Sequence, residues 1–166
     1  MRIPVPPSST DTTIAMAKTG PMTPTLLRQR LHSCCFACGD NTSAGLGLRC
    51  EAACGGVARA RFIPQPWMRG YADRLHGGIV ATVLDSAMTQ CLFQHGVAAV
   101  TADLRVRFRR PALMTSRFEV IARIVEQRHG VWCAAAELLS QEVRIATATA
   151  RFVNLQYPEG DIRAER

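Results

Sequence analysis

The sequence lacks an uninterrupted apolar run of membrane-spanning length, and residues 1–24 lack the compact apolar stretch of a secretory signal. We therefore expect a cytoplasmic protein. Residues 1–24 are instead rich in Pro, Ser and Thr, a composition that cannot build a core, so they predict a mobile tail. Because 166 residues are too few for two comfortable domains, we expect one domain over residues 25–155 and a second tail over residues 156–166.

Aromatic residues are scarce: the chain has two Trp and two Tyr, which leaves little for stacking on nucleic-acid bases. Its net charge of +7 suits an anionic partner, such as nucleic acid, a membrane surface or a small phosphorylated ligand. The arginines are spread over several segments and do not cluster with aromatic residues. We therefore expect no nucleic-acid partner and no membrane partner.

A disulfide framework is not expected, because seven cysteines are an odd number in a chain with no recognisable secretory signal. Cys34, Cys35 and Cys38, with His32 nearby, resemble half of a zinc site. No second Cys-x-x-Cys or His-x-x-x-His follows at ligand spacing, although Cys50 and Cys54 are candidates. We therefore expect a folded loop with buried thiols and no metal.

Hydrophobic periodicity predicts a short helix at residues 25–31 and a long apolar helix at residues 75–94. Six strands are expected, at residues 46–50, 58–62, 101–109, 117–126, 131–139 and 143–153, with a turn at 53–56 and a loop at 64–74. The connections are too short for repeated crossovers, so the strands should pair antiparallel. The expected class is α+β, with the long helix on one face of a curved sheet.

Asp85 is the lone charged residue between Arg74 and Asp103, and it lies within the predicted apolar helix. Burial of an ionised carboxylate is costly unless the group is paired, hydrogen-bonded or raised in pKa. Asp85 is therefore a candidate general base or nucleophile. The alternative is a helix-surface Asp that is hydrogen-bonded to nearby backbone or to an arginine.

The long helix begins at His76, Gly77 and Gly78. The two glycines leave the N–H groups of the first turn unshielded by a Cβ, and such donors have no partner inside the helix. An oxyanion could lie against them, helped by the positive end of the helix dipole. A strand-to-helix turn without a chemical role would have a similar sequence.

His76 and Asp85 are nine residues apart, which corresponds to about 13 Å along a straight helix, on roughly opposite faces. One helix cannot bring both residues to a single carbonyl group. If both serve one site, an antiparallel copy of the helix, related by a two-fold axis, must supply one of them. The spacing therefore predicts a homodimer.

Three segments together resemble the hotdog-fold acyl-CoA thioesterases of the PaaI-like group. They are the Leu75–Gly78 turn with Asp85 after it, the segment VTADLRVRFRRPA at residues 100–112, and an upstream stretch made of Cys35, Cys38, Gly39, Asn41, Gly45 and Leu46. The resemblance covers roughly residues 34–155. It implies a central helix wrapped by a six-stranded antiparallel sheet, dimers whose sheets join edge to edge, and often tetramers.

The resemblance also implies roles for individual residues. The family's acid falls on Asp85, and its oxyanion glycine falls on Gly77 with Gly78 beside it. The family's histidine falls on His76, which would either transfer a proton or only cap the turn. A hydroxyl that orients water in several members falls on Thr101, otherwise an ordinary strand threonine.

Two positions depart from the family pattern. Gly70 stands six residues before the histidine, where some relatives have an Asn that contacts the thioester, and Arg69 stands where a Gln is common. Both departures bear on substrate placement. Trp67, Arg69 and Tyr71 could line the mouth of a pocket or simply cover the edge of the core.

Arg105, Arg107, Arg109 and Arg110 form a row in and after the predicted strand at residues 101–109. Such guanidinium groups could bind the phosphates of coenzyme A. Alternatively, the row is simply the exposed, solvated face of a strand.

The expected function is therefore hydrolysis of an acyl-CoA thioester, with coenzyme A as part of the substrate and no further cofactor. Gly77 N–H would polarise the carbonyl, the partner subunit's Asp85 would activate a water or attack directly, and Thr101 would hold that water. The alternatives are a non-catalytic acyl-CoA-binding hotdog domain and a hotdog dehydratase. A homodimer, possibly a homotetramer, is expected.

Overall fold

The computed structural model describes residues 23–42 and 45–155. Apart from Thr23 and Pro24, the predicted tails at residues 1–24 and 156–166 lie outside the described residues. Within the described part of the chain, no helix is long and apolar enough to cross a membrane.

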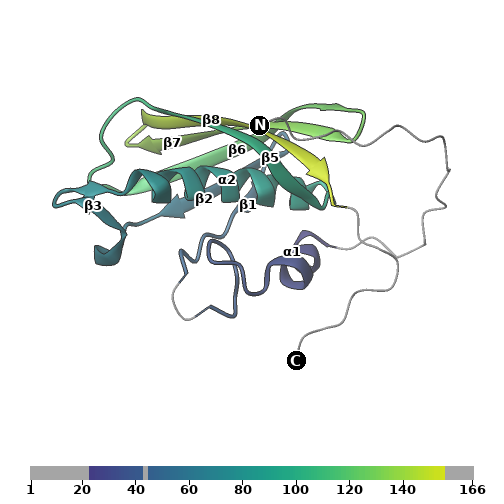
Figure 1. Ribbon diagram of the computed structural model, residues 1–166, viewed down its shortest axis with the longest axis horizontal. Coiled ribbons are helices and arrows are strands. Elements are labelled where there is room, and N and C mark those ends of the chain that lie inside the picture. The colour runs from purple at the N-terminus through teal and green to yellow at the C-terminus, as the bar shows by residue number, and fades with distance from the viewer. Residues whose placement is uncertain (1–22, 43–44, 156–166) are drawn as a thin grey trace, which may run out of the picture.

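Two α-helices and a six-stranded antiparallel sheet form most of the described chain (Figure 1). The helices are α1, Pro24–His32, and α2, Gly77–Gln94. The strands of the sheet are β1, Glu51–Ala53; β2, Val57–Phe62; β5, Ala99–Phe108; β6, Phe118–Arg128; β7, Val131–Ser140; and β8, Val143–Asn154. They lie in the order β1-β2-β6-β7-β8-β5. One long helix packed on a six-stranded antiparallel sheet is the predicted architecture, and it is confirmed.

A small structured segment precedes α2 where the sequence predicts a loop. It consists of the 3-10 helix η1, Pro66–Met68, and the two short strands β3, Arg69–Tyr71, and β4, Arg74–Leu75. Leu75 N donates to the Ala112 carbonyl over 2.8 Å, which holds Leu75 in an extended conformation. The helix α2 therefore begins at Gly77, two residues later than predicted.

The alternating segment at residues 46–50, predicted as a strand, lies outside the sheet, because the first strand is β1 at Glu51–Ala53. Leu46 N and Leu48 N donate to the carbonyls of Phe36 and Ala37, each over 2.9 Å. The segment thus pairs with the loop that follows α1. Leu48 is buried in the core, so the alternation correctly predicts a buried side chain. The prediction that the backbone of this segment pairs within the sheet is wrong.

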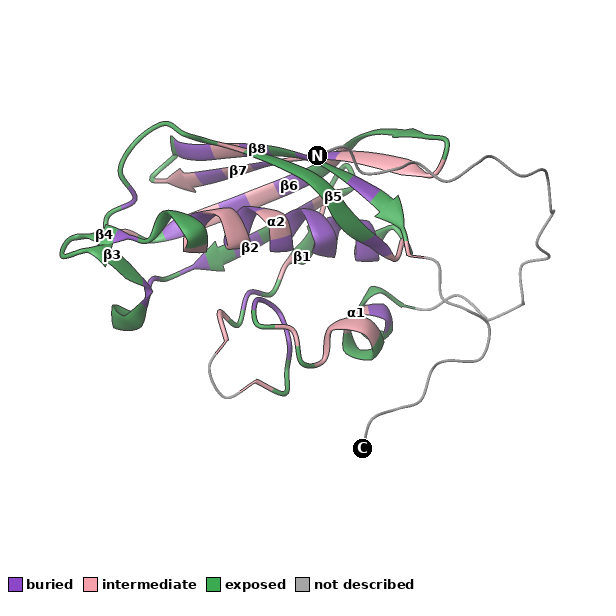
Figure 2. Cartoon of the chain, viewed as in Figure 1, coloured by how far each residue is buried: buried purple, intermediate pink, exposed green. Residues whose placement is uncertain are grey.

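The helix α2 is rich in apolar residues, and it is covered on two sides. Eleven of its eighteen residues are buried, and Figure 2 shows that burial is greatest toward its C-terminal end. The sheet covers one side, and α1 with the segment before β1 covers the other. The rings of His32 and Phe93 meet edge to face with centroids 5.0 Å apart. The Gln90 amide, buried in the same place, bonds to Cys50 N at 3.0 Å and to the Leu48 carbonyl at 3.1 Å, which satisfies its polar atoms without water.

A row of alanines crosses the inner face of the sheet under α2. The row, which we call the alanine row, consists of Ala58, Ala122, Ala136 and Ala148, which are cross-strand neighbours on β2, β6, β7 and β8. All four are buried in the core that they form with α2. Side chains that end at Cβ let the helix lie close to the sheet, because a longer side chain would occupy the same space. On β8 the row is flanked by Ala146 and Ala150, which are also buried.

The strand β5 forms one edge of the sheet, and no described strand pairs with its outer side. It is ten residues long and exposes the large apolar side chains of Val100, Leu104 and Phe108. A long edge strand with exposed apolar residues is a template for pairing with another chain. The opposite edge, β1, has three residues and offers a much shorter template.

The alanine row leads to a prediction about stability. Ala136→Leu should lower the free energy of unfolding by about 1–3 kcal/mol, because the added carbons must displace α2 or adopt strained rotamers. Urea unfolding followed by circular dichroism measures this loss. The matched control is Ala135→Leu, which adds the same side chain to the neighbouring, half-buried position on the opposite face of β7. Equal losses in the two variants would show that α2 does not depend on the alanine row.

Candidate functional site

Asp85 lies in the middle of α2, and its carboxylate reaches the edge strand β5. Thr101 Oγ1 donates to Asp85 Oδ1 over 2.8 Å. The Asp85 side chain is half-buried, and Thr101 is exposed. The structure therefore brings together the acid and the hydroxyl that the sequence analysis assigned to one site.

Burial raises the pKa of the Asp85 carboxyl above its ordinary value, because the ionised form loses hydration inside the protein. The Thr101 hydroxyl and the His32 ring act in the opposite direction, and both are weaker than the effect of burial. A carboxylate with a raised pKa is a stronger base than an exposed one, which suits the abstraction of a proton from water. The nearby His32, at the end of α1, was not anticipated from the sequence.

His76 is the N-cap residue of α2. Its Nδ1 accepts a hydrogen bond from Gly78 N over 2.9 Å, so in this arrangement the ring proton is assigned to Nε2. Capping occupies Nδ1, so a proton-transfer role for His76 would have to use Nε2. The structure thus shows His76 as the cap of α2, and its role in proton transfer stays a prediction.

The hydrogen bond to His76 also distinguishes the two glycines at the start of α2. Gly78 N–H is engaged by the histidine ring, whereas Gly77 N–H has no hydrogen-bond acceptor among the described residues. Gly77 is the first residue of an eighteen-residue helix, where the helix dipole adds positive potential. Gly77 is therefore the available donor for an oxyanion, and Gly78 supports the cap.

A cavity of about 530 Å³ opens beside Gly77. The strands β3 and β4 and the start of α2 form one part of its wall. The residues of this part are Gly70, Tyr71, Arg74, Leu75, His76 and Gly77. Val80, Ile145 and the segment from Phe108 to Ala112 form the rest. Of the predicted substrate-binding residues, Tyr71, Arg109 and Arg110 line the cavity, and Arg69 and Arg107 do not. Both polar and apolar parts of a ligand would find partners there.

Phe108 is a lining residue that the sequence analysis did not select. A Cβ placed on Gly77 would lie 3.5 Å from Phe108 Cζ, so the phenyl ring stands directly beside the candidate oxyanion donor. The ring is 56% exposed. The signal was present in the alternation of the predicted strand, whose apolar side ends at Phe108.

Gly70 lies with its backbone against the α2 turn. A Cβ at Gly70 would be 3.1 Å from the Cα of His76, tighter than most contacts of this kind. The close approach favours glycine at this position, where the resemblance allows an Asn. Position 70 of this chain therefore offers no side chain that could contact a substrate.

Two arginines give the cavity a positive rim. Arg110 Nη1 donates to the Arg144 carbonyl over 3.1 Å, which fixes the direction of that side chain. The backbone N–H groups of Arg109 and Arg110 both donate to the Ile145 carbonyl, at 2.8 and 3.0 Å. The two guanidinium groups therefore extend from an anchored backbone, as phosphate recognition requires.

The acid and the donor are far apart within one chain. Gly77 and Asp85 are eight residues apart in a continuous helix, which places them about 12 Å apart along its axis. Asp85 is not among the residues that line the cavity beside Gly77. The candidate donor at the start of α2 and the candidate acid in its middle therefore do not meet within the described chain.

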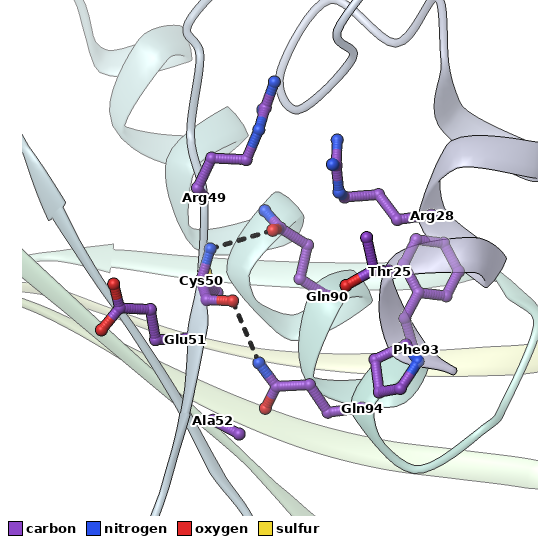
Figure 3. A pocket seen from close by; sticks show the side chains of 10 residues that line it. Thr25, Arg28, Arg49, Cys50, Glu51, Ala52, Gln90, Phe93 and Gln94 are labelled. Carbon is purple, nitrogen blue, oxygen red and sulfur yellow. Dashed lines mark hydrogen bonds between the residues drawn. The ribbon is translucent and has the colours of Figure 1, made fainter.

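A second cavity, of about 430 Å³, lies between α1, β1 and α2 (Figure 3). Gln90 and Gln94 face it, but both amides bond to the backbone of Cys50. Arg28 and Arg49 are also engaged, because each donates to the Cys38 carbonyl over 2.7 Å. The two glutamines thus hold the segment before β1 on α2, and the two arginines hold the turn at Cys38.

The buried thiols of Cys38 and Cys50 are not activated nucleophiles. Burial raises the pKa of the Cys38 thiol to about 12 and that of the Cys50 thiol to about 12, so both stay protonated as free thiols at neutral pH. Within the described residues, one group has metal-ligand geometry, and it consists of His32, Cys35 and Cys38. The other cysteines considered in the sequence analysis, Cys34, Cys50 and Cys54, are not part of this group.

The sequence is similar to a known protein family and to a curated enzyme. The model of the thioesterase superfamily matches residues 73–147, a range that contains Gly77, Asp85 and Thr101. Acyl-coenzyme A thioesterase THEM4 from Bos taurus is 28% identical over 92 residues. That match covers 54% of this chain and 38% of THEM4, so this chain spans less than half the length of the curated relative.

Two solved structures establish the class of fold. The PaaI protein of the E. coli phenylacetic acid degradation operon has a TM-score of 0.61 and 20% identity, and the match covers 66% of this chain and 84% of PaaI. A hypothetical thioesterase of Streptococcus pneumoniae, solved with coenzyme A, has a TM-score of 0.61 and 16% identity, with 65% and 85% covered. The fold is the hotdog fold. With the superfamily match, this confirms the resemblance to hotdog-fold thioesterases of the PaaI-like group.

The hydrogen bond between Thr101 and Asp85 generates a prediction. Thr101→Val keeps the side-chain shape but removes the hydroxyl that favours the ionised carboxylate, so the pKa of Asp85 should rise further. A carbon-13 NMR titration of the Asp85 carboxyl measures the change. Thr101→Ser is the control, because it keeps the donor and should titrate close to the wild type. An unchanged midpoint in Thr101→Val would show that the hydroxyl does not act on Asp85.

Proposed function

We propose that this protein is an acyl-CoA thioesterase. The main observation behind this proposal is that one helix contains both a half-buried carboxylate and a free N–H donor. The carboxylate is Asp85, oriented by Thr101, and the donor is Gly77 N–H, which has no acceptor among the described residues. Thioester hydrolysis needs a base for water and a donor for the carbonyl oxygen, and these two groups supply both functions. The superfamily match and the acyl-CoA thioesterase named among the relatives support the same reaction.

In the proposed reaction, the Asp85 carboxylate takes a proton from water while the water oxygen bonds to the thioester carbon. The carbonyl oxygen becomes an oxyanion and accepts a hydrogen bond from Gly77 N–H. When the carbonyl re-forms, the carbon–sulfur bond breaks, and the coenzyme A thiolate leaves and takes up the proton. Thr101 holds the carboxylate in position for the first step.

We further propose that two copies of the chain complete each site. The separation of about 12 Å between Gly77 and Asp85 prevents both from reaching one carbonyl in a single chain. An antiparallel copy of α2 around a two-fold axis places the partner subunit's Asp85 near Gly77. The exposed edge of β5, with Val100, Leu104 and Phe108, supplies an apolar template for joining the two sheets.

Coenzyme A is the proposed carrier of the acyl group. The S. pneumoniae relative was solved with coenzyme A, and in this chain Arg109 and Arg110 stand at the rim of the cavity beside Gly77. Guanidinium groups bind phosphates through paired, charge-assisted hydrogen bonds. The volume of about 530 Å³ suits the pantetheine arm and part of the acyl group, with Phe108 and Ile145 as apolar wall.

The first test replaces the proposed base. Asp85→Asn keeps the volume of the side chain and removes its basicity, so thiol release from acyl-CoA should fall by about two to four orders of magnitude. Binding of the acyl-CoA should persist. Unchanged turnover would remove Asp85 from the mechanism, and wild-type protein that binds acyl-CoA without releasing thiol would favour the non-catalytic alternative.

The same substitution should stabilise the fold. Because the pKa of Asp85 is raised above its ordinary value of 3.8, the folded chain binds this proton more tightly than the unfolded chain. Stability therefore falls as pH rises from 3.8 through the folded pKa, and the full loss is present above the folded pKa. Asn carries no such ionisation, so the thermal midpoint of Asp85→Asn should exceed that of wild type at pH 7 and approach it in acid.

The second test mixes two inactive variants. Gly77→Pro removes the N–H at the first helical position, where proline is favoured, and His76 already has the extended conformation that precedes proline. Each variant alone should be inactive. If a site uses Asp85 of one chain and Gly77 of the other, random mixing should restore about a quarter of wild-type activity, because half of the dimers are mixed and each has one intact site.

The control for the mixing experiment is Gly77→Ala, which keeps the N–H and places its Cβ at an ordinary 3.5 Å from Phe108. This variant should retain activity. Mixtures that stay inactive after unfolding and joint refolding would show that each chain contains a complete site or that the chains do not pair.

A further inference from the structure

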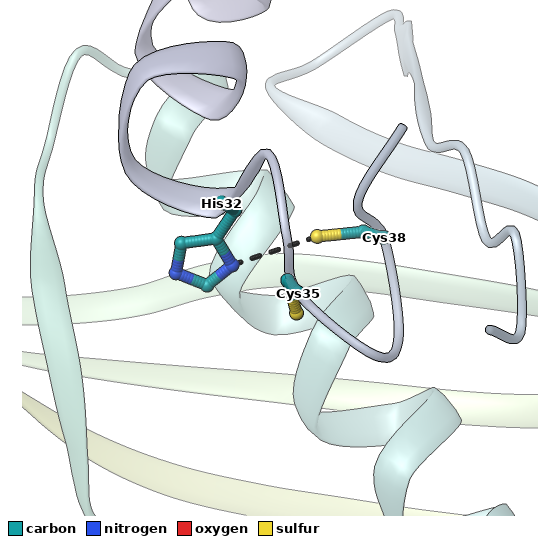
Figure 4. Close-up of side chains that lie close together, drawn as sticks. All are labelled: His32, Cys35 and Cys38. Carbon is teal, nitrogen blue, oxygen red and sulfur yellow. Dashed lines mark hydrogen bonds between the residues drawn. The ribbon is translucent and has the colours of Figure 1, made fainter. Parts of the chain in front are cut away.

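The turn that follows α1 brings three potential metal ligands together. His32 is the last residue of α1, and Cys35 and Cys38 lie in the turn behind it (Figure 4). The ligand atoms of the three residues all lie within 4.8 Å of one another. His32 Nδ1 and Cys38 Sγ are 3.5 Å apart.

These distances suit one tetrahedral ion. Zinc binds thiolate sulfur at about 2.3 Å and imidazole nitrogen at about 2.0–2.1 Å, so ligand atoms in a tetrahedral site lie about 3.6 Å apart. The separation between His32 Nδ1 and Cys38 Sγ has this value within about 0.1 Å. The remaining pairs, within 4.8 Å, need only small side-chain rotations to reach it.

The backbone holds the turn in a closed form. Cys35 N donates to the His32 carbonyl over 3.1 Å, and Gly39 N donates to the Cys35 carbonyl over 2.7 Å. A Cβ at Gly39 would lie 2.5 Å from the Ser33 carbonyl oxygen and 2.6 Å from Cys35 N and O. The turn therefore requires glycine directly after the second cysteine, and the two thiols are held on one side of it.

Side chains from other elements fix the position of Cys38. Its carbonyl accepts from both Arg28 and Arg49, and the same two arginines form ion pairs with Asp40. Its thiol also interacts with the Ser86 hydroxyl of α2. Cys38 is 1% exposed, and His32 and Cys35 are half-buried, so the cluster is built into the contact between the turn and α2.

We propose that His32, Cys35 and Cys38 bind one zinc-class divalent metal ion per chain. Two thiolates and an imidazole select such an ion over Mg²⁺ and Ca²⁺, which prefer oxygen ligands. Three protein ligands leave the fourth tetrahedral position to water or another small ligand. The ion joins the C-terminal end of α1 to the turn that covers α2 on the side of Asp85. The sequence analysis expected buried thiols without metal, because it found only half of a four-ligand zinc motif.

A cobalt titration tests the proposal independently of thioesterase activity. The untagged, reduced full chain is treated with a chelator, freed of it, and titrated with Co²⁺. Thiolate ligation gives a charge-transfer absorption, and tetrahedral geometry gives intense visible bands. Both should saturate at one Co²⁺ per chain and disappear when Zn²⁺ is added. Zn²⁺ should also raise the thermal midpoint, because a ligand that binds only the folded state stabilises it.

Variants separate the cluster from the other thiols. Cys35→Ser, Cys38→Ser and His32→Gln should each lose the saturating absorption and the thermal shift with Zn²⁺. Cys34→Ser is the matched control, because this exposed neighbouring thiol is outside the cluster, and it should behave as wild type. Far-UV circular dichroism of each metal-free variant checks that it is folded.

Three results would overturn the proposal. They are the absence of the charge-transfer absorption in the reduced wild-type chain, its loss in Cys34→Ser, and its persistence in Cys35→Ser together with Cys38→Ser. The wild-type titration is decisive by itself, so the test does not depend on the folding of any variant. Metal binding in a chain that lacks thioesterase activity would still support this site.

Discussion

The close packing of α2 on the alanine row fixes the rest of the structure. The row has no side-chain atoms beyond Cβ, so the helix lies against the sheet, and the apolar residues of α2 complete the core. The first turn of the helix and Asp85 are then held in place by the same packing. This arrangement sets the direction of the Gly77 N–H and brings the Asp85 carboxylate within 2.8 Å of the Thr101 hydroxyl on β5.

The position of Asp85 has an energetic cost that packing alone does not explain. A carboxylate with a pKa raised by burial destabilises the folded chain at neutral pH, and an apolar or amide side chain would avoid this. Local features that oppose stability occur where function requires them. The exposed edge of β5 is a second such feature, because a solitary chain gains nothing from presenting Leu104 and Phe108 to water. Both features are consistent with a site completed between two chains.

The N-terminal segment covers the side of α2 that the sheet leaves open. It was only partly predictable, because its structure depends on hydrogen bonds between residues that no periodicity relates. The segment at residues 46–50 has the alternation of a strand, yet it bonds to the loop after α1. In this segment the His32 ring contacts the Cys38 thiol, and it also packs edge to face on Phe93 of α2. The same cover thus accounts for the apolar character of α2, for the misplaced strand and for the metal-ligand cluster.

The sequence alone determined the features that depend on local pattern. Periodicity located both helices and five of the six strands, and the isolation of Asp85 in an apolar helix, eight residues after Gly77, identified the two parts of the candidate site. Only the tertiary structure decided which side chains meet these groups. It placed the Phe108 ring beside Gly77, left the Gly77 N–H without an acceptor among the described residues, and set His32 near Asp85. These contacts join segments that are distant in the chain, and their partners are chosen by strand register and by the way α1 packs on α2, which local sequence does not encode.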